Sequence, residues 1–276
     1  MPIARAETSC SLAASPETHR SLPRWCWDYV RQMLALAGFF VTGLVVSPVC
    51  ALLLALGGGR IPPEKGQRLI RWLFRTWIDF SSWLGVFEIR FSEVERLSQL
   101  RGTLIAANHP SVLDAVLLLA VIPRTVCIMR ANLARSPFVG GAARLAGYVT
   151  NDSGPALVRQ GVACIQRGDN LLIFPEGTRT RDGAMNPFKN GFALIAARAR
   201  VPIQTVFIER ESRYLGKGVS FFSGSALPLR YELRLGGGFH AEDGESAAEL
   251  AARMEDYFRR HLRESGTAIR FQPSVP

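Results

Sequence analysis

A histidine and an aspartate stand five residues apart in the segment 108–114, which reads NHPSVLD. Residues five apart on one helix point about 140° away from each other, so His109 and Asp114 can meet only across a chain corner. The apolar residues before this segment predict a strand and those after it predict a helix, with His109 in the corner between them. A carboxylate bound to one imidazole nitrogen would leave the other free to take a proton from an alcohol near neutral pH.

Two other interpretations of the same residues stay open. Ser111 and Asp114 have the spacing of a helix capping box, in which Asp114 would only complement the helix dipole and His109 would be a polar loop residue. Alternatively, Ser111 could be a nucleophile with His109 as its base, as in a hydrolase or a ping-pong transferase. No Gly-x-Ser-x-Gly pattern surrounds Ser111, which disfavours the covalent route.

A second polar segment, 174–179 (FPEGTR), follows the apolar residues LLI about 65 positions downstream of His109. Gly177, just beyond a strand end, would let backbone N–H groups approach an anion closely, and Arg179 offers a planar fork that matches phosphate oxygens. Glu176 could orient Arg179 or the hydroxyl groups of a bound molecule. The alternative is an ordinary polar turn with a Glu–Arg pair at the surface.

The charge balance favours an anionic partner. Lys and Arg total 33 against 23 Asp and Glu, a net charge of +10, which suits a phosphorylated substrate, an anionic membrane or nucleic acid. No zinc-finger or RNA-recognition pattern is present, so nucleic acid is not expected. Arg181 and Lys189 either extend the anion site or face solvent. The five cysteines lack metal-ligand spacing, and neither a metal nor a cofactor is expected.

Residues 33–56 form an uncharged run of 24 residues, long enough to cross a bilayer. A buried helix of a soluble protein is the alternative. Pro48 interrupts the run and three glycines, 57–59, end it, which favours a bent or re-entrant hairpin with both ends cytoplasmic. Residues 64–87 combine arginines on one helical face with Trp, Phe and Leu, and are expected to lie in the membrane interface or to dock on the protein core.

From residue 88 the pattern alternates between strands and helices. This predicts an α/β fold with a mostly parallel central sheet flanked by helices, behind an N-terminal membrane-associated helical segment. We expect a flexible tail over 1–24, the membrane-associated segment over 25–87 and the α/β domain over 88–276. Strands are expected at 87–91, 103–107, 125–129, 170–174, 203–208 and 229–235. Helices are expected at 112–121, 138–146, 155–167, 188–199 and 246–263, the last with a capping box at Ser246 and Glu249, after a flexible glycine turn at 236–238.

The two polar segments together resemble the glycerol-phosphate and lysophospholipid acyltransferase family. Its first motif, His-x4-Asp preceded by Asn108, and its FPEGTR block match in order and spacing. Arg130 and the run 137–148 are similar to the second block, and Val201-Pro202-Ile203 to the fourth. The likeness covers about residues 88–210.

The resemblance implies transfer of a fatty acyl group from acyl-CoA or an acyl carrier protein to the free hydroxyl of a lysophospholipid such as 1-acylglycerol 3-phosphate. His109 and Asp114 would be catalytic, at the cytoplasmic face of a membrane, with a bacterial inner membrane expected. The residues expected to bind substrate are Asn108, Ser111, Arg130, Glu176, Gly177, Thr178 and Arg179.

Two departures from the family pattern leave the acceptor open. Residues 147–153 read GYVTNDS, where the family often ends this block with Ile-Asp-Arg, so the terminal arginine is missing. Residues 214–218 (YLGKG) are similar to family members of aryl polyene lipid pathways. Another lysolipid, such as an aryl polyene or aminolipid precursor, is therefore an alternative acceptor. A non-catalytic phospholipid-binding membrane protein is the remaining alternative.

Overall fold

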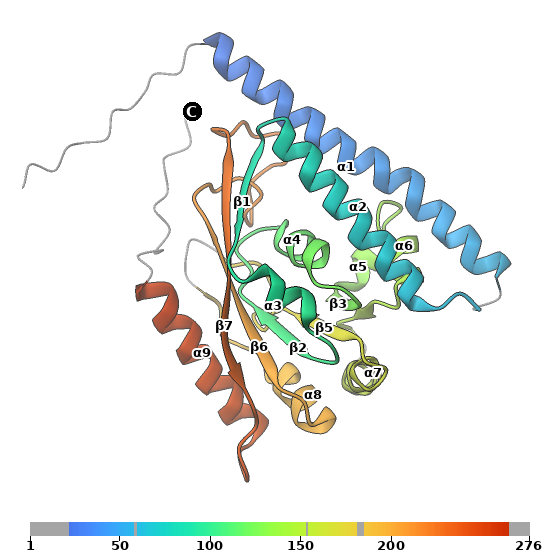
Figure 1. Cartoon of the computed structure of the whole chain (residues 1–276), viewed down its shortest axis with the longest axis vertical. Helices are drawn as coiled ribbons and strands as arrows, with labels where there is room; N and C mark the ends of the chain where they lie inside the picture. The colour runs from blue at the N-terminus through green and yellow to red at the C-terminus, as the bar shows by residue number, and fades with distance from the viewer. Residues whose placement is uncertain (1–21, 58–59, 153, 181–184, 265–276) are drawn as a thin grey trace, which may run out of the picture.

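The computed structural model describes residues 22–57, 60–152, 154–180 and 185–264. Among these residues seven strands form one sheet, in the order β1-β7-β6-β2-β5-β3-β4 (Figure 1). Neighbouring strands are parallel except β6 and β7, which confirms the predicted mostly parallel sheet. The strands are β1 (Phe87–Phe91), β2 (Leu104–Ala107), β3 (Thr125–Met129), β4 (Val149–Thr150), β5 (Asn170–Ile173), β6 (Ile203–Arg210) and β7 (Leu229–Phe239).

Helices cover both faces of the sheet (Figure 1). On β2, Ile105 and Ala107 join the apolar cluster that contains α4, whereas Leu104 and Ala106 join the cluster with α8 and α9. Burial on both faces explains why this strand reads as an unbroken apolar run rather than an alternating one. The helices after the N-terminal pair are α3 (Val94–Gln99), α4 (Asp114–Val121), α5 (Ala131–Ala134), α6 (Gly140–Leu145), α7 (Pro155–Gln166), α8 (Gly191–Ala199) and α9 (Ala247–Glu264).

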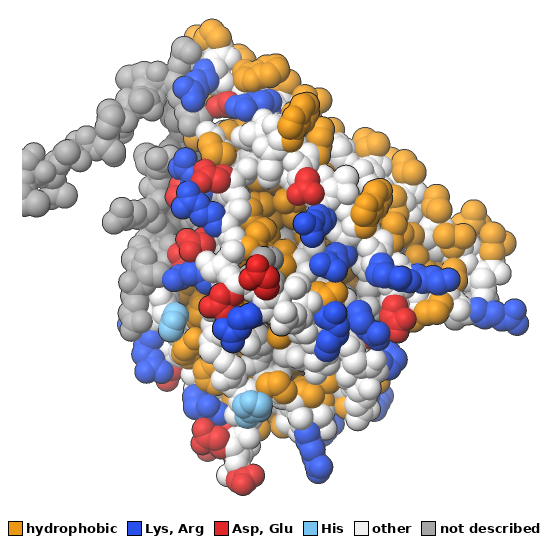
Figure 2. Space-filling view, viewed as in Figure 1, with side chains coloured by type: hydrophobic (Ala, Val, Ile, Leu, Met, Phe, Trp, Pro, Cys, Tyr) orange, Lys and Arg blue, Asp and Glu red, His pale blue; other side chains and the backbone are white. Residues whose placement is uncertain are grey.

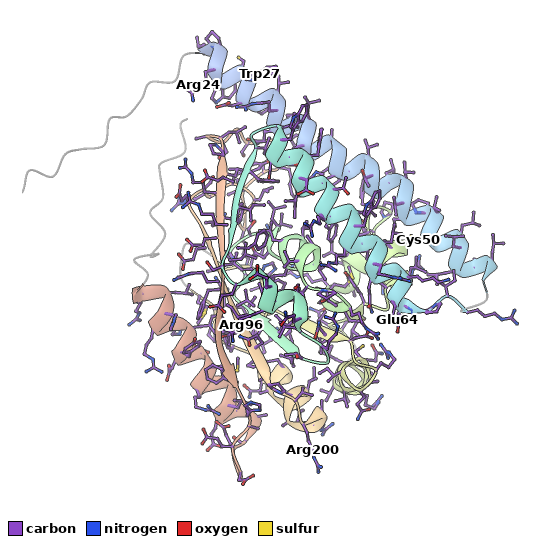
Figure 3. The ribbon with its side chains drawn as sticks, viewed as in Figure 1. Arg24, Trp27, Cys50, Glu64, Arg96 and Arg200 are labelled. Carbon is purple, nitrogen blue, oxygen red and sulfur yellow. The ribbon has the colours of Figure 1, made fainter. Side chains whose placement is uncertain are left out.

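The N-terminal pair, α1 (Leu22–Leu56) and α2 (Pro63–Trp83), forms an antiparallel hairpin that lies along the α/β domain (Figure 1). The hairpin is closed by the indole of Trp77, which donates to the carbonyl of Ala35 at 2.8 Å. At the start of α2, Glu64 accepts from Arg124 of the domain at 3.0 Å (Figure 3). Trp77 therefore holds the two helices together, and Glu64 ties the start of α2 to the domain.

One stripe of α1 faces the domain, and much of the remaining surface is exposed and apolar. The buried positions have a helical spacing of three or four residues within two groups: Asp28, Gln32 and Ala35 in the first half, and Ser47 and Cys50 in the second. Large apolar side chains such as Val41, Val45 and Leu52 are 58–61% exposed, and Figure 2 shows this apolar surface along the upper right edge of the molecule. By length and composition α1 could cross a membrane, but its domain-facing stripe is already occupied by protein.

Two sequence-based expectations about backbone were wrong. Pro48 does not interrupt the helix, because α1 continues to Leu56 with α6 packed against it through the hydrogen bond from Gly141 N to Ser47 Oγ. Glycines 236–238 are not a turn but part of β7. A Cβ on Gly236 would lie 2.3 Å from Thr205 Oγ1, so glycine is needed here for close packing against β6.

The predicted helices and strands agree with the structure to within a few residues, apart from α3, α5 and β4, which were not predicted. The capping box of α9 is confirmed, since Ser246 N donates to Glu249 at 2.8 Å and Glu249 N donates to Ser246 Oγ at 3.2 Å. Most of the expected tail, residues 1–21, lies outside the described residues, and α1 begins at Leu22. We propose residue 87, where α2 has ended and β1 begins, as the boundary of the α/β domain.

Candidate active site

His109 and Asp114 meet across the corner between β2 and α4, as their spacing predicted. His109 Nδ1 lies 2.8 Å from Asp114 Oδ2. The same carboxylate oxygen accepts from Ser111 N at 2.7 Å. One carboxylate oxygen thus makes both the contact with His109 and one half of a capping box, and the alternative in which Asp114 only complements the helix dipole is wrong. The imidazole also stacks on Phe174, with ring centroids 4.0 Å apart, and its side chain remains 18% exposed.

Asp114 is fully buried, and this burial raises the pKa of its carboxyl group. The hydrogen bond from His109, the charge of His109 and the Ser111 N–H act in the opposite direction and favour the ionised form. Its Oδ1 has no hydrogen-bond partner within the described residues. A carboxylate held with incomplete solvation is a strong acceptor for the imidazole N–H and stabilises an imidazolium beside it.

Glu176 organises the corner rather than pairing with Arg179. It is 2% exposed, and its Oε1 accepts from His109 N at 3.0 Å. Its Oε2 accepts from both the backbone and the side chain of Asn186 at 2.8 Å, and Thr180 Oγ1 reaches both oxygens. The expectation that Glu176 orients Arg179 and the alternative of a surface Glu–Arg pair were both wrong. Glu176 fixes the backbone that carries the imidazole.

Asn108 and Ser111 were expected to contact substrate, but the structure buries both. Asn108 exchanges two 2.8 Å hydrogen bonds with the backbone of Ile208, which joins the ends of β2 and β6. Ser111 is fully buried, accepts from Leu113 N at 3.1 Å and lies 3.1 Å from the hydroxyl of Tyr231. These side chains hold the corner together and are not presented to a ligand.

Arg130 and Arg179 reach this edge of the sheet from the ends of β3 and β5. Arg130 donates to Thr178 Oγ1 at 3.0 Å. Arg179 donates to the carbonyls of Leu215 and Gly216 at 3.3 and 3.0 Å, and burial together with the charge of Arg130 lowers its pKa. Carbonyl groups orient a guanidinium without neutralising it, so both arginines keep their positive charge for an anion.

Sequence reasoning missed Arg210, at the end of β6. It donates to the carbonyls of Ser212 and Tyr214 at 2.8 and 3.0 Å, and burial lowers its pKa. Within the described ranges, no carboxylate lies at ion-pair distance from Arg130, Arg179 or Arg210. The sequence signal for Arg210 was weak, since it is only a charged residue that ends an apolar strand at the same edge of the sheet as the two polar segments.

Gly177 has a φ of +65°, a left-handed conformation that glycine adopts without strain. A Cβ there would lie 2.9 Å from the side chain of Lys189, so Lys189 lies over the FPEGTR turn. Arg181 lies outside the described residues. The described residues contain no cluster of three or more His, Cys, Asp or Glu side chains that could hold a metal ion.

An apolar chamber of about 320 Å³ adjoins this corner. Val112, Leu113 and Leu215 line it on the side of the His109 corner, and α1 and α2 form much of its opposite wall. Val112 N donates to the carbonyl of Leu215 at 3.0 Å, and that carbonyl also binds Arg179. The chamber and the arginine cluster therefore share one piece of backbone.

The fold and this geometry define an α/β protein that carries a His–Asp pair beside a cluster of arginines at the carboxyl edge of a mostly parallel sheet. The acyltransferase family profile matches residues 88–209. Human 1-acyl-sn-glycerol-3-phosphate acyltransferase beta is 30% identical over 217 residues, covering 73% of this chain and 72% of that protein. The lyso-ornithine lipid O-acyltransferase of Pseudomonas aeruginosa is 34% identical over 178 residues, 63% of this chain and 65% of that protein.

The crystal structure of the 1-acyl-sn-glycerophosphate acyltransferase PlsC from Thermotoga maritima has the same fold. It superposes with a TM-score of 0.67 at 21% identity, covering 89% of this chain and all of that one. The chain belongs to the acyltransferase family of the 1-acyl-sn-glycerol-3-phosphate acyltransferases, and it is an O-acyltransferase.

Proposed function

We propose that this enzyme transfers a fatty acyl group from a thioester to the free hydroxyl of a lysophospholipid such as 1-acylglycerol 3-phosphate, with His109 as the general base. The observation that carries the proposal is the 2.8 Å contact between His109 Nδ1 and the buried Asp114, beside arginines that form no ion pair with a carboxylate among the described residues. A proton acceptor and an anion pocket at one edge of a sheet suit an acceptor with a hydroxyl near a phosphate.

In this mechanism His109 Nε2 takes the proton of the acceptor hydroxyl while its oxygen attacks the thioester carbonyl carbon. The C–O bond forms, the C–S bond breaks, and the departing thiolate takes the proton back from the imidazolium. Asp114 holds the tautomer and stabilises the transient positive charge. Burial of Ser111 against Tyr231 argues against the covalent alternative, in which Ser111 would be the nucleophile.

Arg130 and Arg179 would bind the phosphate, with Arg210 adding positive charge from behind. Thr178 would help indirectly by fixing Arg130, and Gly177 by keeping the turn compact. Glu176 would act through the backbone of His109 rather than on the substrate. The apolar chamber next to the corner has the composition and place needed for an acyl chain.

The site would lie at the cytoplasmic face of a membrane, which in a bacterial cell is the inner membrane. The exposed apolar face of α1 supports this, together with Trp72, Phe80 and Trp83 of α2, which are 41–79% exposed. Figure 2 shows basic side chains gathered on the face below the hairpin, where they would meet anionic headgroups or an acidic donor. The donor would be acyl-CoA or an acyl carrier protein thioester.

A lyso-aminolipid is the second candidate acceptor. The similarity to a lyso-ornithine lipid O-acyltransferase favours it, as does the missing arginine at the end of the 147–153 segment, where the chain has Asp152 and Ser153. A zwitterionic headgroup needs less positive charge around it than a phosphate monoester does. A site that lacks this arginine would therefore suit a lyso-aminolipid acceptor.

An acyl-transfer assay with the purified protein in mixed vesicles tests the proposal. Each lysolipid of a panel is paired with acyl-CoA and with acyl carrier protein thioester, for wild type and for His109→Ala. We expect transfer to a phosphate-bearing lysolipid and a loss of about 10²–10⁴-fold in the variant. Binding of lipid without transfer to any acceptor would support the non-catalytic alternative, and near wild-type turnover by His109→Ala would remove His109 from the mechanism.

A further inference from the structure

The segment between β6 and β7, residues 211–228, forms part of the wall of the arginine cluster, and we call it the strap. Its carbonyls at Leu215 and Gly216 hold the guanidinium of Arg179 at 3.3 and 3.0 Å. The carbonyl of Leu215 also accepts from Val112 N at 3.0 Å, two residues after the corner proline. The position of the strap therefore sets where the charge of Arg179 lies relative to His109.

The far part of the strap is attached to α1 rather than to the sheet. Gln32 Nε2 donates to the carbonyl of Ser223 at 2.7 Å, and Gln32 Oε1 accepts from Ser225 N at 3.1 Å. Farther along the helix, Phe221 packs edge-on against Phe40 with ring centroids 5.9 Å apart. The side chain of Trp25, near the start of α1, closely approaches Gly224.

Gln32 is a polar residue in a helix whose surroundings are mainly apolar, and it is only 2% exposed. A buried amide is costly unless its donor and acceptor are both used. Here they are used on one short piece of backbone, so Gln32 clamps the strap in a defined register on α1. Within the strap, Ser212 Oγ pairs with Ser225 Oγ at 2.9 Å and connects the clamped end to the end near Arg210.

We infer that Gln32 is a positioning residue for the anion pocket: through the strap it fixes the carbonyls that orient Arg179. The inference rests on the proposed function, because it assigns Arg179 to the phosphate of the acceptor. It adds that the membrane-associated hairpin is part of the acceptor site, since the residue that fixes Arg179 lies on α1. Phe222 of the strap is 71% exposed, and Trp27 of α1, labelled in Figure 3, is 60% exposed.

The variant Gln32→Met tests this, because it removes both hydrogen bonds and keeps the length of the side chain. The matched control is Gln67→Met, a buried amide of α2 that donates to the carbonyl of Ala146 and contacts no strap residue through a hydrogen bond. We expect Gln32→Met to raise KM for a phosphate-bearing lysolipid roughly three- to tenfold with little change in kcat. Gln67→Met is expected to leave both values within twofold of wild type.

A double-mutant cycle distinguishes positioning from a general loss of fold. In an Arg179→Met background, Gln32→Met should change the acceptor KM by less than about twofold, because the group it positions is gone. Because Gln32 also lines the chamber, the KM of the Gln32→Met variant for the acyl donor is measured as well, and it should change less than the KM for the acceptor. Equal thermal midpoints of Gln32→Met and Gln67→Met would exclude a difference in stability as the cause.

Additive effects of Gln32→Met and Arg179→Met would overturn the inference, as would a rise in the donor KM without a rise in the acceptor KM. Either result leaves the proposed function intact, because wild type still transfers acyl groups. Failure of wild type to acylate any lysolipid would instead remove the proposed function, and with it the assignment of Arg179.

Discussion

His109 is held by three groups from different parts of the chain. Asp114 binds the imidazole Nδ1, and Phe174 stacks on the face of the ring. The carboxylate of Glu176 accepts from the backbone N–H of His109. Only Nε2 remains for a substrate. Preorganisation of this kind lowers the cost of reaching the reactive geometry, because the ring need not be oriented during the reaction.

Asp114 is expected to lower stability at neutral pH while supporting activity. Its pKa in the folded protein is raised above the unfolded value of about 3.9. The contribution is therefore fully stabilising only below that unfolded value and is lost as the pH rises through the folded pKa. Asp114→Asn should lose about 10²–10⁴-fold in activity, yet unfold at pH 7.5 at a temperature no lower than wild type.

Thermal unfolding at pH 4 and pH 7.5 checks this expectation. The unfolding temperature of wild type, relative to that of Asp114→Asn, should be lower at pH 7.5 than at pH 4. A variant much less stable than wild type at pH 7.5 would contradict the sign derived from burial, and would mean that the hydrogen bonds from His109 and Ser111 outweigh desolvation.

Ser111→Ala separates a structural from a chemical role of the hydroxyl. The change leaves the hydroxyl of Tyr231 and the N–H of Leu113 without their partner in a buried region, so we expect a loss of about 1–3 kcal/mol in the free energy of unfolding. Turnover below the unfolding transition should stay within a few-fold of wild type. Denaturant unfolding and initial rates at low temperature measure the two effects, and a loss of turnover comparable to that of His109→Ala would revive Ser111 as the nucleophile.

At the scale of the elements, the sequence predicted what depends on local pattern. The corner at His109 followed from a strand, a proline and a five-residue spacing, and the structure agrees. The role of Glu176 could not be predicted, because its partners Thr180 and Asn186 lie in an irregular loop whose path has no periodic signal. Arg210 was missed for a similar reason: its partners are carbonyls of the strap. Glycines 236–238 were misassigned because a run of glycines usually predicts a turn, whereas here the run continues β7 and close packing against Thr205 requires glycine at Gly236.

The packing of α1 against the domain depends on glycine at one position and not at another. A Cβ on Gly43 would lie 2.6 Å from the backbone carbonyl oxygen of Phe138, whereas a Cβ on Gly38 would meet only the Phe80 ring at 3.8 Å. Gly43→Ala should therefore lose about 1–3 kcal/mol, and Gly38→Ala in the same helix should gain up to about 1 kcal/mol through helix propensity. The difference in thermal midpoint between these two variants measures the effect, and equal midpoints would show that α1 shifts freely on the domain.

At the scale of the whole molecule, the hairpin serves two surfaces at once. Its inner side forms much of the wall of the apolar chamber, and its outer side is the most continuous apolar surface of the described residues in the view of Figure 2. Trp27 and Cys50, labelled in Figure 3, lie near the two ends of α1. At 1.5 Å per residue a 35-residue helix is about 52 Å long, more than a bilayer core of about 30 Å. Because α1 buries one stripe between Asp28 and Cys50 against protein, we expect the helix to lie in the interface rather than to span it.

This arrangement predicts that charge on the outer face of α1 releases the protein from membranes without unfolding it. Val41, Val45 and Leu52 are 61%, 60% and 58% exposed, so replacing all three with Glu should leave the core intact. Since each side chain would lose the transfer of apolar surface into lipid, worth about 25 cal/mol per Å², we expect most of the protein to stay with the soluble fraction in a vesicle flotation assay. The triple change Arg90→Gln, Arg96→Gln and Arg230→Gln, at positions outside the hairpin that are 73%, 68% and 50% exposed, lowers the net charge by the same amount and is the control that should still float. If the triple α1 variant floats like wild type, α2 or the strap alone anchors the enzyme. In that case the variant should acylate a short-chain acceptor dissolved in water no faster than it acylates a lipid in the bilayer.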